Sequence, residues 1–320
     1  MLSFATVTRA LNELEREGYL IRIQGRGTFV QAVEPTATAN PANMKTVCVF
    51  IPWDARIPSH INYRTLYRGL ENSRAPFMTL KLIPYSLRPD DLEPFLFSRE
   101  PIGGVVFVYP DEVHLPLIER FARQHPAVVI GTEVRSKNIG CVWTDNRLAA
   151  QQAVQYLVDL GHRNIGIISA PLTVSDAAER LDGYKDALKK NKLPYDDSAV
   201  VFTNPIDLNG YSGCVNMLGR NHDITALFAA GDVIAMGVFA AAKVLGRAIP
   251  KQLSVVGFDD TDYAAEMAPP LTTIHVPYED MAAKAMEILS GMIQRGKVSR
   301  ESLPAPLIVR GSARKAPAVK

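Results

Sequence analysis

The 320-residue sequence predicts an α/β fold with two doubly wound parallel sheets. From residue 45 almost to the end, short apolar segments of strand length alternate with amphipathic segments of helix length. Apolar strands that alternate with crossover helices are typical of parallel sheets covered on both faces. This region is about 270 residues long, more than one such sheet usually needs, so we expect two lobes.

The composition is that of a folded globular chain without a strong charge bias. Hydrophobic residues make up 47%, charged residues 21%, and the formal net charge is +2. Any contact with nucleic acid must therefore come from a local patch. Cys48, Cys141 and Cys214 are widely spaced and predict buried free thiols in a reducing compartment. The sequence shows no signal-peptide pattern and no apolar run of membrane-spanning length, so we expect a cytoplasmic protein without membrane contact.

Residues 1–31 are predicted to form a helix followed by a β-hairpin. Gly18 is placed to cap the end of the helix, and strands at 19–23 and 28–30 flank a tight turn at 24–27. Residues 32–44 hold two prolines and many small residues without periodicity, which indicates a linker.

The later elements follow in order along the chain. Strands are expected at 47–52, 104–109, 127–131, 141–144, 165–169, 226–230 and 254–258, and helices at 148–160, 177–190, 233–245 and 281–294. Ligands of open α/β sheets bind at the carboxyl ends of the strands, so the residues that end or directly follow these strands are candidates for a binding site. These candidates are Trp53, Tyr109, Asp145, Ser169, Gly231 and Asp259.

No catalytic or metal-binding motif fits its context. Residues 291–297 match the start of a phosphate-binding loop, but Val298 replaces the magnesium-binding hydroxyl and the segment closes a helix. Gly296 is better explained as the cap of that helix. The six histidines never fall at metal-ligand spacing, and capping at a helix end suffices to explain His162. We therefore expect no enzyme activity, no metal and no cofactor.

The N-terminal helix and hairpin place polar residues where a winged helix contacts DNA. Thr6, Thr8 and Arg9 lie on the first turns of the helix, and Arg26 lies between two glycines in the turn of the hairpin. The alternative is an amphipathic helix and a surface hairpin of no special purpose, because the segment is hardly a basic patch.

Two stretches of the chain resemble known families. SFATVTRAL at 3–11 and QGRGTFV at 24–30 resemble the second half of the GntR-type winged helix. From residue 144 onward, the chain resembles the effector domain of the LacI (lactose repressor) family in segments 144–146, 160–165, 180–184, 227–232, 254–260 and 269–274. The combination is similar to the arabinose-repressor subfamily.

The resemblance implies a two-lobed fold like that of periplasmic binding proteins, preceded by a partial winged-helix head. The head is 1–31, the linker 32–44 and the effector domain 45–320, with lobe 1 at 45–144 and 277–303 and lobe 2 at 145–275 and 304–320. The three crossovers between the lobes would form the hinge.

The resemblance also implies a function: a ligand-responsive regulator, a repressor of carbohydrate metabolism, that senses a sugar or related small polar molecule. Operator DNA would be contacted by Ser3, Phe4, Thr6, Thr8, Arg9, Gln24, Arg26 and Gly27. The GntR head has two further helices before the recognition helix, and this sequence begins at that helix, so we expect weak operator binding. A homodimer is implied, with 62–71 and 265–270 as candidate interface segments.

The effector site is implied by position. Arg180 aligns with an arginine that clamps ligand hydroxyls or carboxylates, and the alternative is a surface ion pair with Asp182 or Glu179. We expect Arg180 and Asp259 to face each other across the ligand in lobe 2. The remaining candidates are Asp145 as an acceptor, Trp53, Tyr109 and Tyr278 as ring contacts, and Gly231, which stands where the family usually has Asn.

Two competing functions stay open at this point. One is a solute-binding protein that delivers sugar to a transporter, and the missing signal peptide and the attached helix–hairpin argue against it. The other is a sugar-modifying enzyme, which would need an acid–base pair beyond Asp145 and Asp259.

Overall fold

The computed structural model describes residues 20–23, 27–30, 44–52, 63–85, 88–97, 102–172, 175–203 and 209–317. The chain divides into two units, 1–44 and 45–320. The described part of the first unit is an antiparallel strand pair, β1 (Leu20–Ile23) and β2 (Gly27–Val30), with Leu20 opposite Val30. The expected recognition helix, the turn at 24–26 and most of the expected linker lie outside the described residues.

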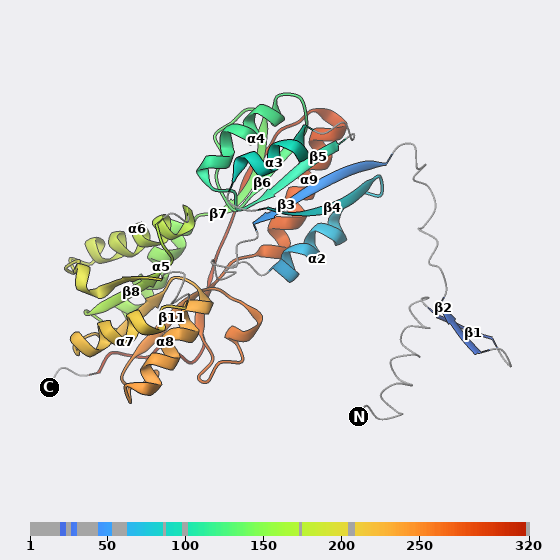
Figure 1. The fold of residues 1–320 in the computed structure, drawn as a ribbon. Helices are drawn as coiled ribbons and strands as arrows, with labels where there is room; N and C mark the ends of the chain where they lie inside the picture. The colour runs from blue at the N-terminus through green and yellow to red at the C-terminus, as the bar shows by residue number, and fades with distance from the viewer. Residues whose placement is uncertain are drawn as a thin grey trace. The chain divides into compact units, whose positions relative to one another are not determined.

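The second unit contains two six-stranded sheets, one in each lobe (Figure 1). In lobe 1 the strand order is β13-β7-β6-β5-β3-β4, and every pairing is parallel. The strands are β3 (Lys45–Pro52), β4 (Met78–Tyr85), β5 (Ile102–Val108), β6 (Ala127–Ile130), β7 (Ile139–Thr144) and β13 (Arg300–Leu303). The helices are α2 (Tyr63–Ser73), α3 (Pro89–Leu96), α4 (Leu115–Ala122) and α9 (Tyr278–Arg295).

In lobe 2 the order is β14-β12-β11-β10-β8-β9, parallel except for β14. The strands are β8 (Ile165–Ser169), β9 (Val200–Phe202), β10 (Ala226–Ala229), β11 (Ser254–Asp259), β12 (Thr272–His275) and β14 (Leu307–Ile308). The helices are α5 (Asn146–Asp159), α6 (Ser175–Lys190), α7 (Tyr211–Arg220) and α8 (Asp232–Val244). These two sheets confirm the predicted fold class.

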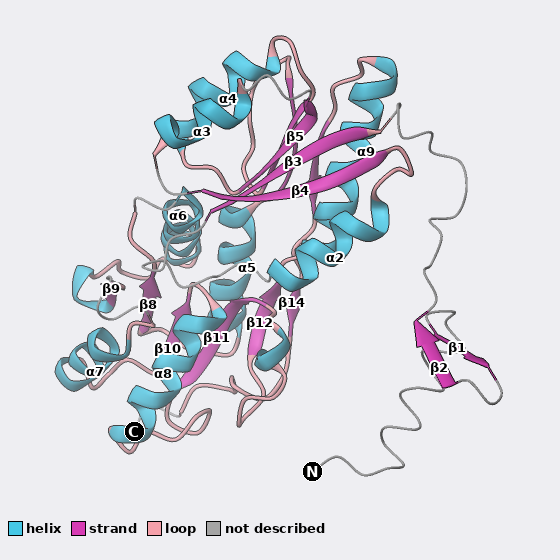
Figure 2. Ribbon diagram, turned by 45° about the vertical axis from the view of Figure 1, so that its right-hand side comes forward, coloured by secondary structure: helices cyan, strands magenta, loops and turns pink. Residues whose placement is uncertain are grey.

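The chain crosses between the lobes three times (Figure 2). The first crossover lies between β7 and α5, the second between β12 and α9, and the third between β13 and β14. Each crossover links an element of one lobe to an element of the other, so a relative movement of the lobes changes the backbone at these points.

Alternating strand residues build an apolar core on both faces of each sheet. In β3, Val47 and Val49 pack with α2 and α9, whereas Cys48 and Phe50 pack with α3 and α4. In lobe 2, α5 and α6 cover one face and α7 and α8 the other. The core beneath α2 and α9 is continuous with the core beneath α5 and α6, so the lobes share one apolar cluster. The three cysteines are buried and form no disulfide with one another, as predicted.

Close contact between helices depends on glycine at Gly183 in α6. A Cβ there would overlap the backbone carbonyl oxygen of Arg147 in α5 and would crowd Ala150. Gly183 therefore sets the distance between α5 and α6, and α6 is the helix that carries Arg180.

The His162 side chain makes contacts beyond those expected of a helix cap. The side chain is buried, Nδ1 lies 2.8 Å from Thr225 Oγ1, and Nε2 lies 3.0 Å from both Ser254 Oγ and the Arg314 carbonyl oxygen. The His162 side chain thus joins the starts of two strands to the C-terminal segment. The His162 amide also caps the end of α5, as expected, by donating to the Leu157 carbonyl oxygen at 3.1 Å. Gly296 is the C-cap of α9 with φ 65°, as predicted.

Candidate functional site

A buried arginine forms the centre of the candidate site. Arg180 is 3% exposed, and its guanidinium lies 3.8 Å above the Phe258 ring. Nη2 donates to Asp176 Oδ2 at 2.8 Å, one turn earlier on α6. The expected alternative, a surface ion pair with Asp182 or Glu179, is therefore wrong.

The remaining donors of Arg180 are directed at lobe 2. Nη1 donates to the carbonyl oxygen of Ala230 at 2.8 Å, and Nε donates to Asn146 Oδ1 at 3.1 Å. Ala230 follows β10, and Asn146 begins α5. The guanidinium is thus fixed at the carboxyl edge of the lobe 2 sheet, the edge at which α/β proteins bind ligands.

Asp259 lies beside Arg180 at the end of β11. Its Oδ1 is 3.5 Å from Arg180 Nη2 and accepts a hydrogen bond from the Tyr278 hydroxyl at 3.1 Å. Asp259 is 1% exposed, and Oδ2 has no hydrogen-bond partner among the described residues. Its φ of 109° is strained for a non-glycine residue, and such strain gathers at functional sites. Arg180 and Asp259 thus lie side by side at ion-pair distance.

Lobe 1 contributes Tyr109, at the end of β5. The Tyr109 and Tyr278 rings have centroids 6.5 Å apart. Tyr109 has φ 45°, and its ring occupies the space that a Cβ at Gly131 would need. Its hydroxyl is close enough to Asp176, Arg180 and Asp259 for their charges to act on it. Tyr109 therefore connects lobe 1 directly to the charged cluster of lobe 2.

Burial and neighbouring charges shift the pKa values of Asp259, Arg180 and Tyr278. Burial raises the pKa of Asp259 well above its usual range, and the nearby Arg180 opposes this shift. Burial alone would lower the pKa of Arg180, but Asp176 and Asp259 outweigh it and raise that pKa. Burial, followed by the charge of Asp259, also raises the pKa of Tyr278. Arg180 therefore stays charged.

A second buried carboxylate supports the site from behind. Asp232, at the start of α8, is 0% exposed and accepts hydrogen bonds from the Thr261 amide at 2.7 Å and the Thr261 hydroxyl at 2.9 Å. Its other oxygen accepts from the Thr273 hydroxyl at 2.6 Å. Asp232 thereby fixes β12 and the turn after β11, and Asp259 is the last residue of β11. Burial raises the pKa of Asp232 to about 6.

The raised pKa of Asp232 predicts a specific pH dependence of stability. A carboxyl whose pKa is higher in the folded state stabilises the protein at low pH, and this contribution is lost as the pH rises through about 6. As the pH rises from 5 to 7, the free energy of unfolding of Asp232→Asn should therefore increase by roughly 1 kcal/mol relative to that of the wild type. Urea denaturation at both pH values measures this, with Asp182→Asn, at an exposed carboxylate on α6, as the control. Parallel pH profiles of Asp232→Asn and the wild type would contradict the assignment.

The structure does not bring all predicted site residues together. Asp145 is exposed and caps α5, where its Oδ1 accepts a hydrogen bond from the Leu148 amide at 2.8 Å. Gly231 is the residue before α8 and adjoins Ala230, within the site. Trp53 and the predicted DNA contacts Ser3, Phe4, Thr6, Thr8, Arg9, Gln24 and Arg26 lie outside the described residues, and Gly27 begins β2.

Three residues of the site were not among the predicted site residues. Asp176 lies four residues before Arg180, a spacing that predicts an ion pair on one helix face. Asn146 directly follows Asp145 and carried no separate signal. Ser169, which ends β8, was noted only for its position, and its Oγ is buried without a hydrogen-bond partner among the described residues.

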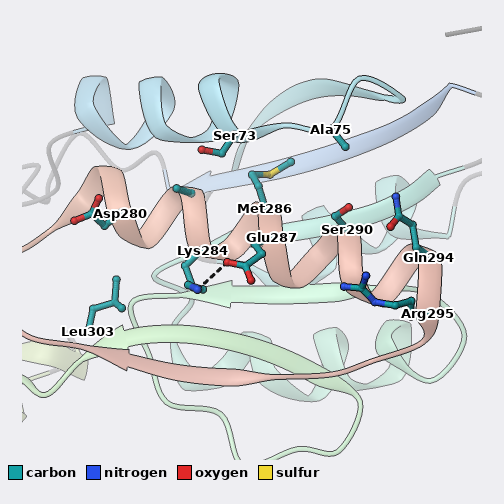
Figure 3. A pocket seen from close by; sticks show the side chains of 11 residues that line it. Ser73, Ala75, Asp280, Lys284, Met286, Glu287, Ser290, Gln294, Arg295 and Leu303 are labelled. Carbon is teal, nitrogen blue, oxygen red and sulfur yellow. Dashed lines mark hydrogen bonds and ion pairs between the residues drawn. The ribbon is translucent and has the colours of Figure 1, made fainter. Parts of the chain in front are cut away.

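Two cavities among the described residues lie away from Arg180. One of about 610 Å³ follows the exposed side of α9 in lobe 1 (Figure 3), where Lys284 and Glu287 pair at 2.7 Å. Another of about 450 Å³ lies at the opposite edge of the lobe 2 sheet, near Arg163 and Tyr184. Within the described ranges, no cluster of His, Cys, Asp and Glu could hold a metal ion. The helices described here also include none with the length and apolarity of a bilayer crossing.

Comparisons with known proteins connect this geometry to a family. Residues 154–313, half of the chain, match the periplasmic binding protein-like domain. Catabolite control protein A of Priestia megaterium is 29% identical over 320 residues, covering 95% of this chain and 93% of that protein. The HTH-type transcriptional regulator GalR of Salmonella typhimurium is 36% identical over 148 residues, which span 46% of this chain and 43% of GalR.

Two solved structures share the fold. A complex of the transcriptional regulator CelR with cellobiose has a TM-score of 0.73 at 23% identity, covering 98% of this chain and 92% of that one. A regulatory protein of the LacI family from Chloroflexus aggregans has a TM-score of 0.74 at 21% identity, covering 84% of this chain and 98% of that one. The proteins named here are regulators rather than enzymes, as expected of this chain.

Proposed function

The chain belongs to the periplasmic binding protein-like domain family, and we propose that it is a LacI-type transcriptional regulator that senses a small polar molecule, such as a sugar, at Arg180. One observation carries the choice of site. Arg180 and Asp259 are buried together at the carboxyl edge of the lobe 2 sheet, and Asp259 Oδ2 has no partner among the described residues. A buried acceptor without a donor is costly, and a ligand hydroxyl or amine would satisfy it.

Closure of the lobes is the proposed response to the ligand. Tyr109 belongs to lobe 1 and lies within reach of the charges of Arg180 and Asp259 in lobe 2. A ligand bound between these groups would contact both lobes and favour the arrangement that brings them together. In a dimer, that change would alter the spacing of two DNA-binding heads.

For the DNA-binding head, we propose the winged helix expected from the sequence. The antiparallel pairing of β1 with β2 has the form of a wing, and Arg26 falls between the two strands in the sequence. The relatives above support the LacI-type effector domain but give no support to a GntR-type head. A regulator of transcription acts on DNA, which supports a cytoplasmic location.

We further propose a two-fold dimer through α2 and residues 265–270. Tyr67 on α2 is 40% exposed, and most of 265–270 is accessible in the single chain. Light scattering at micromolar concentration should give the mass of two chains with or without ligand. A monomer under both conditions would contradict the proposal.

The proposed function is tested by a ligand screen coupled to a DNA assay. Thermal unfolding of the purified chain is measured with monosaccharides, sugar acids, sugar phosphates and amino sugars. A ligand at 100 times its Kd stabilises the folded state by about 2.7 kcal/mol. Selected DNA fragments from the host genome are then bound with and without each hit, at fixed salt. A hit that changes DNA binding supports the regulator; hits that never affect DNA binding would favour a solute-binding protein.

Gly231→Asn tests the pose of the ligand. Gly231 has φ 170°, an extended conformation that asparagine adopts freely, and it stands at the N-cap position of α8. The variant should therefore fold as well as the wild type or be stabilised by a few tenths of a kcal/mol. Ligand affinity should be kept or increased if the ligand contacts this position through hydrogen bonds. Normal stability with complete loss of binding would instead show that Gly231 makes room for the ligand.

A further inference from the structure

Two carboxyl groups share the guanidinium of Arg180. Arg180 is the one cation that acts on Asp259 among the described residues, whereas Asp176 and Asp232 add negative charge to the same environment. Asp111, from lobe 1, is also close enough for Asp176 to act on it. Asp176 pairs with Arg180 at 2.8 Å and Asp259 lies 3.5 Å from it, so one guanidinium serves two buried carboxylates.

Arg180 uses three of its five N–H donors for acceptors of the protein itself. Its Nε, Nη1 and Nη2 each donate to a protein acceptor: Asn146 Oδ1, the Ala230 carbonyl oxygen and Asp176 Oδ2. Stacking on Phe258 fixes the plane of the guanidinium. A phosphate or carboxylate at Arg180 would have to approach the buried carboxylates of Asp176 and Asp259, which costs free energy.

The unused groups of the site are a carboxylate oxygen and a hydroxyl group, and the hydroxyl can both donate and accept. Asp259 Oδ2 and Ser169 Oγ are both buried and have no hydrogen-bond partner among the described residues. Asp259 ends β11 and Ser169 ends β8, so both lie at the carboxyl edge of the same sheet. When Asp259 is ionised, Oδ2 accepts hydrogen bonds and cannot donate them. A ligand group that bonds to this ionised oxygen must therefore be a donor.

We propose that the effector presents a protonated amino group to Asp259 Oδ2, and that it belongs to the amine-bearing polar molecules, such as amino sugars. This rests on the proposed function and narrows its ligand class. Burial favours the neutral form of Asp259, and an ammonium group beside Oδ2 would favour the ionised form. A charged donor also forms a stronger bond to a carboxylate than a hydroxyl does. The Tyr109 and Tyr278 rings beside these carboxylates add cation–π attraction.

The test compares ligands that differ only in charge. D-glucosamine, D-glucose and D-glucose 6-phosphate form one matched set, and the corresponding galactose and mannose derivatives form two more. Calorimetry on the whole chain at pH 7 should show at least one amino sugar binding tenfold or more tightly than both of its partners. A neutral or phosphorylated member that binds as tightly, or the failure of every amino sugar to bind, would overturn the inference.

A variant pair tests the assigned atom. Asp259→Asn keeps an acceptor for the Tyr278 hydroxyl but turns the other oxygen into an amide donor, so amine affinity should fall about a hundredfold. Asp182→Asn removes an exposed carboxylate on the same helix as Arg180 and should bind like the wild type. Ser169→Ala should weaken amine binding several-fold if Asp259→Asn does not fold. If Asp259→Asn folds, an unchanged affinity of this variant for the amine would overturn the inference. If Asp259→Asn does not fold, an unchanged affinity of Ser169→Ala would overturn it.

The two levels of the proposal fail separately. Binding of a neutral sugar that changes DNA binding would refute the amine and leave the regulator intact. Amine binding without any effect on DNA would support the ligand class and refute the regulator.

Discussion

Replacing Arg180 with alanine is expected to destabilise the effector unit by about 3–5 kcal/mol and to reduce effector affinity at least tenfold. The side chain is 3% exposed, and its removal leaves Asp176 and Asp259 buried without their cation. It also removes a donor from the Ala230 carbonyl oxygen and the ring contact with Phe258. Urea denaturation measures the first effect and calorimetry the second.

Arg147→Ala is the matched control for this prediction. Arg147 pairs with Asp186 at 2.6 Å, but both side chains are accessible, so water replaces the lost partner. Its denaturation midpoint should stay close to that of the wild type. Equal midpoints for Arg180→Ala and Arg147→Ala would show that the buried network does not stabilise the fold.

Gly183→Val is expected to cost about 3 kcal/mol, the upper end of the range for overpacking. The new side chain would overlap the Arg147 carbonyl oxygen, a backbone atom of α5 that cannot rotate away. Helix α6 must move outward, and because it carries Asp176 and Arg180, effector affinity should fall in the same variant. Denaturation and calorimetry on the same preparation measure both effects.

Gly219→Ala is the matched control for the glycine. Gly219 lies on α7, and a Cβ there meets nothing within 4 Å. This substitution should stabilise the protein by up to about 1 kcal/mol, because alanine loses less backbone entropy in a helix. A destabilised Gly219→Ala together with a neutral Gly183→Val would contradict the packing described for α5 and α6.

Most of the buried apolar strands could be predicted from sequence, but β4 and β9 were missed although both are largely apolar. Polar strands were also missed. Strand β8 was predicted with its observed bounds because its five residues form a short, mostly apolar run. All five residues are buried in the structure. Strand β12 was missed because Thr272 and Thr273 are polar in sequence, and only the fold supplies their partners at Arg310 and Asp232. Strand β13 is short, mostly exposed and charged, so its sequence gives no strand signal.

The candidate site was predictable where a residue ends a strand. Asp259 and Tyr109 were identified from their positions at the ends of β11 and β5, and the structure places both near Arg180. Asp145 shares that position but serves as a helix cap, because α5 begins directly after it. The ion pair of Asp176 with Arg180 determines the charge of the site, and this requires the buried geometry of α6 against β11.

Calorimetric titration of one screened effector into wild-type protein, Asp259→Ala and Asp182→Asn tests the central claim most directly. If the effector binds at the buried cluster, Asp259→Ala should bind at least tenfold more weakly, whereas Asp182→Asn should match the wild type. Wild-type affinity in Asp259→Ala would place the effector elsewhere and contradict the account.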